Sequence, residues 1–107
     1  MKRGDVYWVN FDPAIGSEIT KMRPAVIISN NISNISISRV QVIPLTSNTS
    51  KVYPCETLVF VKNKMAKAMA DQITTVDKLR INNLIGVLTS QELKTINNIL
   101  KLQLDLE

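Results

Sequence analysis

The stretch RPAVIISNNISNISISRVQVIPLT, residues 23–46, contains two apolar segments separated by a polar one. Pro24–Ser29 is a continuous apolar run, and Arg39–Leu45 alternates in the way a β-strand does. The residues between them, Asn30–Ser38, are mostly Asn, Ser and Ile and predict a polar loop. The stretch therefore predicts two consecutive strands joined by a loop.

Pro44 stands near the end of the second of these strands. Because proline has no backbone N–H, it is not expected in the middle of a hydrogen-bonded ladder. We therefore expect the strand to leave the sheet there, at an edge or a bulge.

Further strands flank this pair on both sides. Four are predicted from β-branched and aromatic residues between turn signals: Asp5–Phe11, Glu56–Val61, Lys67–Ile73 and Leu84–Leu88. Lys62–Met65 is expected to be a hairpin turn, and Thr74–Asn83 a connection with a short helical turn in DKLRI. Trp8 and Phe11 are expected in the core.

The carboxyl-terminal segment is the clearest helix in the chain. Thr89 and Glu92 have the spacing of a capping box. An apolar stripe follows at helical spacing, formed by Leu93, Ile96, Ile99, Leu100 and Leu104. Leu102 and Leu106 fall outside this stripe and hint at a second buried surface, which would suit a dimer.

Short strands, tight turns and one terminal helix are typical of a small barrel. We expect a mainly β (α+β) fold, an SH3-like antiparallel β-barrel with a C-terminal helix. The 107 residues show no shift in composition, so a single domain over residues 1–107 is expected. A chain of this size buries only about two thirds of its unfolded surface, so dimerisation would stabilise it.

The composition limits the chemistry. There are 13 Lys and Arg against 9 Asp and Glu, and the net charge of +4 favours a polyanionic partner. The chain has no histidine, which excludes a two-histidine ribonuclease mechanism and a Ser/His/Asp triad. The single Cys55 forms no intramolecular disulfide, and we expect no metal site and no cofactor. Without a membrane-spanning run or a secretory signal, the protein is expected to be cytoplasmic.

Two polar loops, Asp12–Met22 and Thr46–Pro54, are where functional residues are expected. Because the residue before a proline is held extended, Pro24 directs Arg23 outward at the end of the first loop. A planar guanidinium suits phosphate, although an isolated Arg-Pro more often marks an ordinary surface arginine. Thr46 ends the strand before the second loop, where its hydroxyl would either bind a phosphate oxygen or cap a turn.

Five segments carry a resemblance to a known family: RGDVYWVNFDPAIGSE, KMRPAVIIS, VIPLTSN, SKVYP and ADQITTVDKLR. In order, and over nearly the whole chain, they resemble the motifs of the MazF/PemK family of type II toxin-antitoxin ribonucleases. The resemblance implies a homodimeric SH3-like barrel that cuts single-stranded RNA, usually messenger RNA, at a short sequence without a metal. It also implies an antitoxin that neutralises the toxin through an acidic, flexible tail laid over the active surface.

The resemblance further implies roles for single residues. The family's catalytic pair is the arginine before the proline and the threonine at the end of the following strand, which match Arg23 and Thr46. The glutamate of its GSE loop matches Glu18, and the aspartate before the glutamine of a late strand matches Asp71. Because Ser17 stands where some relatives have a histidine, the acid and base of that branch are not carried over.

Cleavage of RNA without a metal uses the neighbouring 2′-hydroxyl as nucleophile and leaves a 2′,3′-cyclic phosphate and a 5′-hydroxyl. We expect Arg23 to stabilise the phosphorane, Thr46 to orient a phosphate oxygen and Glu18 to remove the hydroxyl proton. RNA binding is expected from polar and basic residues near the loops: Ser17, Lys21, Ser47, Asn48, Lys51, Asp71 and Gln72.

Two alternatives stay open. The same barrel serves a family of gyrase-inhibiting toxins, although the Arg-Pro and the strand-end threonine argue against that function. A non-catalytic RNA-binding barrel would keep the basic residues and lack turnover.

Overall fold

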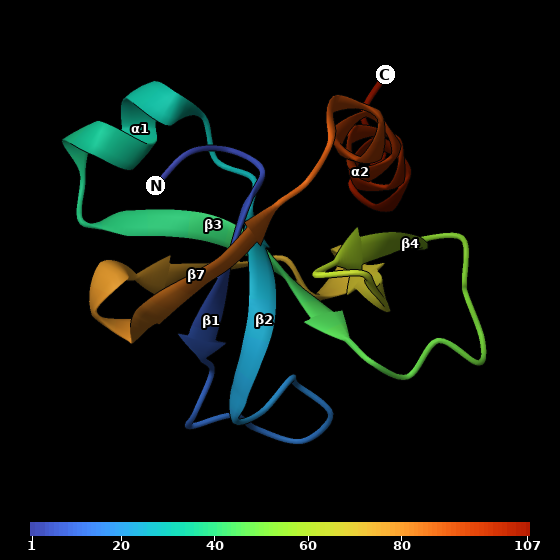
Figure 1. The fold of residues 1–107 in the computed structure, drawn as a ribbon, viewed down its shortest axis with the longest axis horizontal. Coiled ribbons are helices and arrows are strands. Elements are labelled where there is room, and N and C mark those ends of the chain that lie inside the picture. Colours follow the sequence, from blue (N-terminus) through green and yellow to red (C-terminus); the bar gives the residue numbers. More distant parts are fainter.

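The computed structural model describes residues 1–107 as a curled antiparallel sheet with a helix against one side (Figure 1). Its strands are β1 (Asp5–Asn10), β2 (Met22–Ile27), β3 (Arg39–Thr46), β4 (Glu56–Val61), β5 (Lys64–Met69), β6 (Thr74–Asp77) and β7 (Ile81–Val87). The helices are α1 (Asn31–Ser36), α2 (Ser90–Gln103) and the 3₁₀ turns η1 (Ala70–Gln72) and η2 (Lys78–Arg80). This half-barrel with a C-terminal helix confirms the predicted fold class.

The strand order is β4-β5-β3-β2-β1-β7, and β6 pairs with β3 beside β5. The sheet curls so that its two outer strands, β4 and β7, approach each other. A Cβ built on Gly86 in β7 would lie 3.7 Å from a methyl carbon of Val61 in β4. The curl therefore draws side chains from distant strands around one hollow.

The central strand β2 is buried on both faces of the sheet. Val26 belongs to a core cluster that includes Ile96 of α2, whereas Ile27 belongs to a second cluster that includes Val76 of β6. A strand covered on both faces needs apolar residues at consecutive positions, since neither set of alternating side chains meets water. This explains the uninterrupted apolar run that opens the quoted stretch.

The expected exit from the sheet at Pro44 is wrong, because β3 continues to Thr46 and Pro44 stands opposite Ala25 of β2. The Ile28 N–H donates to the Gln41 carbonyl at 3.0 Å, and backbone groups alternate in direction along a strand, so the backbone of Pro44 faces away from β2. On that side β3 pairs with β6 up to Val42 and with β5 from Leu45. The missing donor falls where β3 changes partner.

Helix α2 begins at the predicted cap. The Glu92 N–H donates to Thr89 Oγ1 at 3.1 Å, and the Thr89 N–H donates to Glu92 Oε1 at 2.9 Å, which completes the capping box. Ile96 and Ile99 are buried as predicted, but Leu104 is 47% exposed and lies outside the core. Neither helix has the length and apolar character needed to cross a membrane.

The predicted loop Asn30–Ser38 contains helix α1, so the loop prediction is wrong there. Asn30 caps this helix by accepting the Ser33 N–H at 2.8 Å, and the buried Asn34 is hydrogen-bonded to Ser29. Asn and Ser favour helix caps as much as loops. Ile32 and Ile35 are 80% and 82% exposed, so the helix buries no apolar face.

The second half of the predicted strand Lys67–Ile73 is also wrong, because β5 ends at Met69 and η1 follows. The predicted connection Thr74–Asn83 contains the expected helical turn but also the unpredicted strand β6. Only Val76 of β6 is buried, which is too little for a visible strand pattern.

Candidate active site

A cavity of about 500 Å³ opens at the end of β3 and is lined by residues of β1, β2, β4, β5 and β7 as well. Residues from both outer strands line it, as the curl of the sheet requires. Its lining consists of Trp8, Met22, Arg23, Pro24, Leu45, Thr46, Ser47, Val61, Lys62, Lys64, Met65, Ala66 and Ile85. We call it the Arg–Thr cavity, because it holds both members of the predicted catalytic pair.

Arg23 reaches this cavity from the second residue of β2, opposite Val9 of β1. It is half-buried, and its Nε donates to the Thr20 carbonyl at 3.2 Å. No protein group bonds its two terminal nitrogens, so both remain available to an anion. One edge of the guanidinium is thus held by the protein, and the other is able to bind phosphate.

Thr46 reaches the cavity as the last residue of β3. It is half-buried, and its Oγ1 accepts the Asn48 N–H at 3.3 Å, so it caps the start of the next loop. The hydroxyl hydrogen remains free to be donated. Capping of the loop and binding of a phosphate oxygen are therefore compatible in this geometry.

The lining of the Arg–Thr cavity is basic, with no carboxylate among its residues. Lys62 and Lys64 join Arg23 there from the hairpin between β4 and β5. The turn between these strands has two residues, Lys62 and Asn63, with φ of 51° and 63°, which fits a type I′ hairpin turn. Positive charge therefore surrounds the hollow at the end of β3.

Sequence reasoning missed Lys62, Lys64 and Trp8 as site residues. Trp8 was expected in the core, but it is 40% exposed and lines the cavity opposite Pro24. Val6 and Val9 project from opposite faces of β1 into the two core clusters, so burial along β1 does not follow a single alternating face. The basic excess in the middle of the chain was the available signal for the two lysines.

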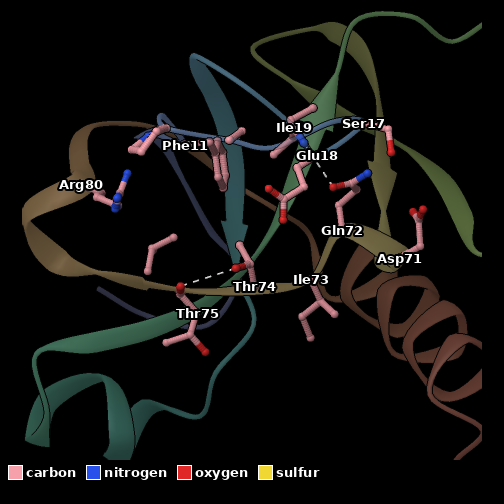
Figure 2. A pocket seen from close by; sticks show the side chains of 13 residues that line it. Phe11, Ser17, Glu18, Ile19, Asp71, Gln72, Ile73, Thr74, Thr75 and Arg80 are labelled. Carbon is pink, nitrogen blue, oxygen red and sulfur yellow. Dashed lines mark hydrogen bonds between the residues drawn. The ribbon is translucent and has the colours of Figure 1, made fainter.

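A second cavity, of about 470 Å³, lies between the β1–β2 loop and β6, and we call it the Glu18 cavity. Figure 2 shows the Glu18 carboxylate directed into it, with Arg80 and Asp71 at opposite ends of the view. The Ile19 N–H donates to Gln72 Oε1 at 3.3 Å and ties the loop to η1. Ser17 also lines this cavity.

The structure divides the predicted site residues among three places. Arg23, Thr46 and Ser47 line the Arg–Thr cavity, whereas four others line the Glu18 cavity: Ser17, Glu18, Asp71 and Gln72. Lys21, Asn48 and Lys51 are exposed and line neither. Glu18 therefore lines a different cavity from Arg23, and its Oε1 accepts the Ile15 N–H of its own loop at 2.7 Å.

Cys55 is a poor nucleophile in this environment. Burial raises the pKa of its thiol, and the negative charges of Asp71 and Glu56 raise it further. The thiol stays protonated at neutral pH. No three carboxylate or thiol side chains lie close enough to share a metal ion.

The chain is similar to proteins of one described family. A family model described as PemK-like, MazF-like toxin of type II toxin-antitoxin system matches residues 2–104. Endoribonuclease MazF9 of Mycobacterium tuberculosis is 38% identical over 115 residues, which cover 99% of this chain and 98% of that protein. Endoribonuclease MazF of Staphylococcus saprophyticus is 32% identical over 111 residues, which cover 99% of this chain and 92% of that protein.

The fold is shared with solved structures. One holds an endoribonuclease in complex with its cognate antitoxin from Mycobacterial species; it has a TM-score of 0.84 and 25% identity, and the match covers 100% of this chain and 97% of that one. The resemblance seen in the sequence motifs is confirmed by the family match and by this fold. The chain belongs to the PemK-like, MazF-like toxins of type II toxin-antitoxin systems.

Proposed function

We propose that this chain is an endoribonuclease that cleaves single-stranded RNA at a short sequence, as the toxin of a toxin-antitoxin pair. The observation that carries the proposal is the Arg–Thr cavity. The terminal nitrogens of Arg23 and the hydroxyl hydrogen of Thr46 are free to bind an anion there, in a basic lining without a carboxylate. Both named relatives are endoribonucleases, which supports the same activity here.

In the proposed reaction, the 2′-hydroxyl attacks the adjacent phosphorus, and the bond from phosphorus to the 5′-oxygen of the next nucleotide breaks. The 2′-hydroxyl loses its proton to a base and the leaving 5′-oxygen takes up a proton from solvent, so the products are a 2′,3′-cyclic phosphate and a 5′-hydroxyl. Arg23 neutralises charge that develops on the phosphorane, which is typically worth about 3 to 4 kcal/mol for one such donor. Thr46 donates to a phosphate oxygen and orients the group for in-line attack. No metal takes part in this scheme.

Glu18 is the proposed base, although it lines a different cavity from Arg23 and Thr46. Its Oε1 accepts the Ile15 N–H and its side chain lines the Glu18 cavity, so we propose that the β1–β2 loop rearranges when RNA binds. We expect Glu18→Gln to lower kcat at least 100-fold with little change in melting temperature. Undiminished cleavage by the folded variant would remove Glu18 from the mechanism.

RNA with and without 2′-hydroxyl groups tests the activity itself. We expect the purified protein to cut a mixed-sequence RNA in the presence of a chelator, and to spare sites with a 2′-deoxy substitution. Binding without cleavage would instead indicate a non-catalytic RNA-binding barrel. Inhibition of gyrase without RNA cleavage would indicate the gyrase-inhibiting class.

The proposed partners are a second copy of this chain and an antitoxin with an acidic, flexible tail. The basic lining of the Arg–Thr cavity suits such a tail, and one structural relative is bound to its cognate antitoxin. Leu102 and Leu106 are each 60% exposed, which leaves apolar surface for an interface.

The proposed homodimer is tested by light scattering on the purified chain, which should give twice the monomer mass. The proposed location is the cytoplasm.

A further inference from the structure

Lys67 and Glu56 form a buried ion pair that neither cavity uses. Lys67 Nζ lies 3.3 Å from Glu56 Oε1, and their side chains are 10% and 8% exposed. Both residues belong to the β4–β5 hairpin, Glu56 at the start of β4 and Lys67 in the middle of β5. Burying a charged side chain is costly unless it is paired, so a buried ion pair in a small domain indicates a structural or functional role.

The pair lies on the face of the sheet opposite to the core cluster that contains Leu45 and Ala68. Leu45 and Ala68 face each other across β3 and β5, and both are fully buried. The next facing pair is Thr46 and Lys67, whose side chains project from the opposite face because side chains alternate along a strand. Lys67 is therefore the cross-strand neighbour of the proposed catalytic threonine.

The β3–β4 loop covers this face and supplies the remaining partners of the ion pair. Lys67 Nζ donates to the Lys51 carbonyl at 2.9 Å, and Glu56 Oε1 accepts the Tyr53 N–H at 2.9 Å. The Glu56 N–H donates to the Tyr53 carbonyl, also at 2.9 Å. Three hydrogen bonds thus hold the second half of a loop that makes a wide excursion from the sheet (Figure 1).

The first half of the loop has only short-range contacts. Asn48 donates its N–H to Thr46 Oγ1, and Ser50 Oγ lies 2.8 Å from Asn48 Oδ1. The loop is therefore anchored at the end of β3 and again at Lys51. Lys51 Nζ and the Tyr53 ring, 5.7 Å apart, project beyond the second anchor, and both side chains are exposed.

We propose that the Lys67–Glu56 pair is a positioning device for the β3–β4 loop, which holds Lys51 and Tyr53 ready to bind RNA beside the Arg–Thr cavity. This inference rests on the proposed RNA cleavage. A loop that is ordered in advance loses less conformational freedom on binding, so the ion pair strengthens RNA binding without touching RNA. Lys67 is not a catalytic residue, since Glu56 and the Lys51 carbonyl already engage its buried ammonium.

The test removes both charges together. Lys67→Met alone would leave Glu56 buried without its partner, whereas replacing both members of a buried pair by apolar residues is often neutral for stability. We therefore choose the double variant Lys67→Met/Glu56→Leu, with Lys67→Arg as the conservative variant and exposed Lys101→Met as the matched control. Melting temperatures establish that each variant is folded.

Two measurements then separate positioning from support of the fold. Hydrogen exchange at the Tyr53 amide should become at least tenfold faster in the double variant, because its acceptor is gone. The KM for RNA should rise about tenfold, with kcat within threefold of the unchanged protein. Lys67→Arg should keep KM within threefold, and Lys101→Met should change neither quantity.

A third arm asks whether the effect passes through the loop. In a Lys51→Ala/Tyr53→Ala background, removing the ion pair should raise KM no further. An unchanged KM in the double variant, or a fall in kcat alone, would overturn the inference. If the unchanged protein does not cut RNA, the proposed function fails, and the rate of Tyr53 exchange still decides whether the pair holds the loop.

Discussion

Arg23 owes its place in the cavity to its neighbour in the chain. Pro24 keeps the backbone extended, and the pairing with Val9 keeps Arg23 in β2. The guanidinium donates from Nε to the Thr20 carbonyl, and its two terminal nitrogens remain free for a ligand. A local constraint on one dihedral angle and one hydrogen bond are enough to direct the charge.

Arg23→Lys tests whether the paired N–H donors of the guanidinium matter beyond its charge. A lysine keeps the charge but offers a single ammonium in place of two parallel donors. We expect kcat to fall about 100- to 1,000-fold in RNA cleavage, with little change in melting temperature.

The control for that experiment is Arg39→Lys, because Arg39 is exposed and lines neither cavity. Its cleavage rate should match that of the unchanged protein. Full activity in Arg23→Lys would show that charge alone suffices.

Helix α2 is joined to β4 by the same carboxylate that caps it. Glu92 Oε2 accepts the Phe60 N–H at 2.8 Å, while Oε1 accepts the Thr89 N–H. Burial alone would raise the pKa of Glu92, but these hydrogen bonds together lower it below its ordinary value of 4.5. The ionised form is therefore the one that the folded protein prefers.

Because the folded-state pKa is the lower one, Glu92 stabilises the fold at pH values above about 4.5, and this contribution disappears as the pH falls through the folded value. We expect Glu92→Gln to lower the free energy of unfolding at pH 7 by about 1 kcal/mol.

Chemical denaturation at pH 7 and at pH 3 measures this effect. The difference between Glu92→Gln and the unchanged protein should shrink at pH 3, and Glu107→Gln at the exposed carboxyl terminus should show no difference at either pH. A constant difference at both pH values would contradict the assignment.

The curl of the whole sheet builds the proposed site. The Arg–Thr cavity takes residues from near the start, the middle and the end of the strand order, among them Trp8, Lys64 and Ile85. The cavity gathers Arg23, Lys62 and Lys64, whereas the net charge of the whole chain is only +4. Polyanion binding is therefore expected to depend on where the charges lie more than on their number.

Salt dependence measures this concentration of charge. Each phosphate contact to single-stranded RNA contributes about 0.7 to the slope of log affinity against log salt. With a 2′-deoxy version of a cleaved RNA, Lys64→Gln should lower the slope by about that amount. Lys94→Gln, on the exposed side of α2, should leave it unchanged. Equal slopes in all three proteins would place the RNA elsewhere.

Prediction from the sequence succeeded where the signal was local. The capping box of Thr89 and Glu92 and the extended Arg23 depend on residues within a few positions. Prediction failed for α1 and β6, since the first exposes its isoleucines and the second buries only Val76. Their stability comes from partners distant in the chain.

The sequence by itself determined the strands of the quoted stretch, the capped helix, the guanidinium held before Pro24 and, through its ordered motifs, the family. Only the tertiary structure decided that Arg23 and Thr46 share a cavity while Glu18 lies in another, and that Lys67 is buried against Glu56. The reason is physical. Backbone preferences and caps act over a few residues, whereas burial and cavity membership depend on how a curled sheet brings distant strands together.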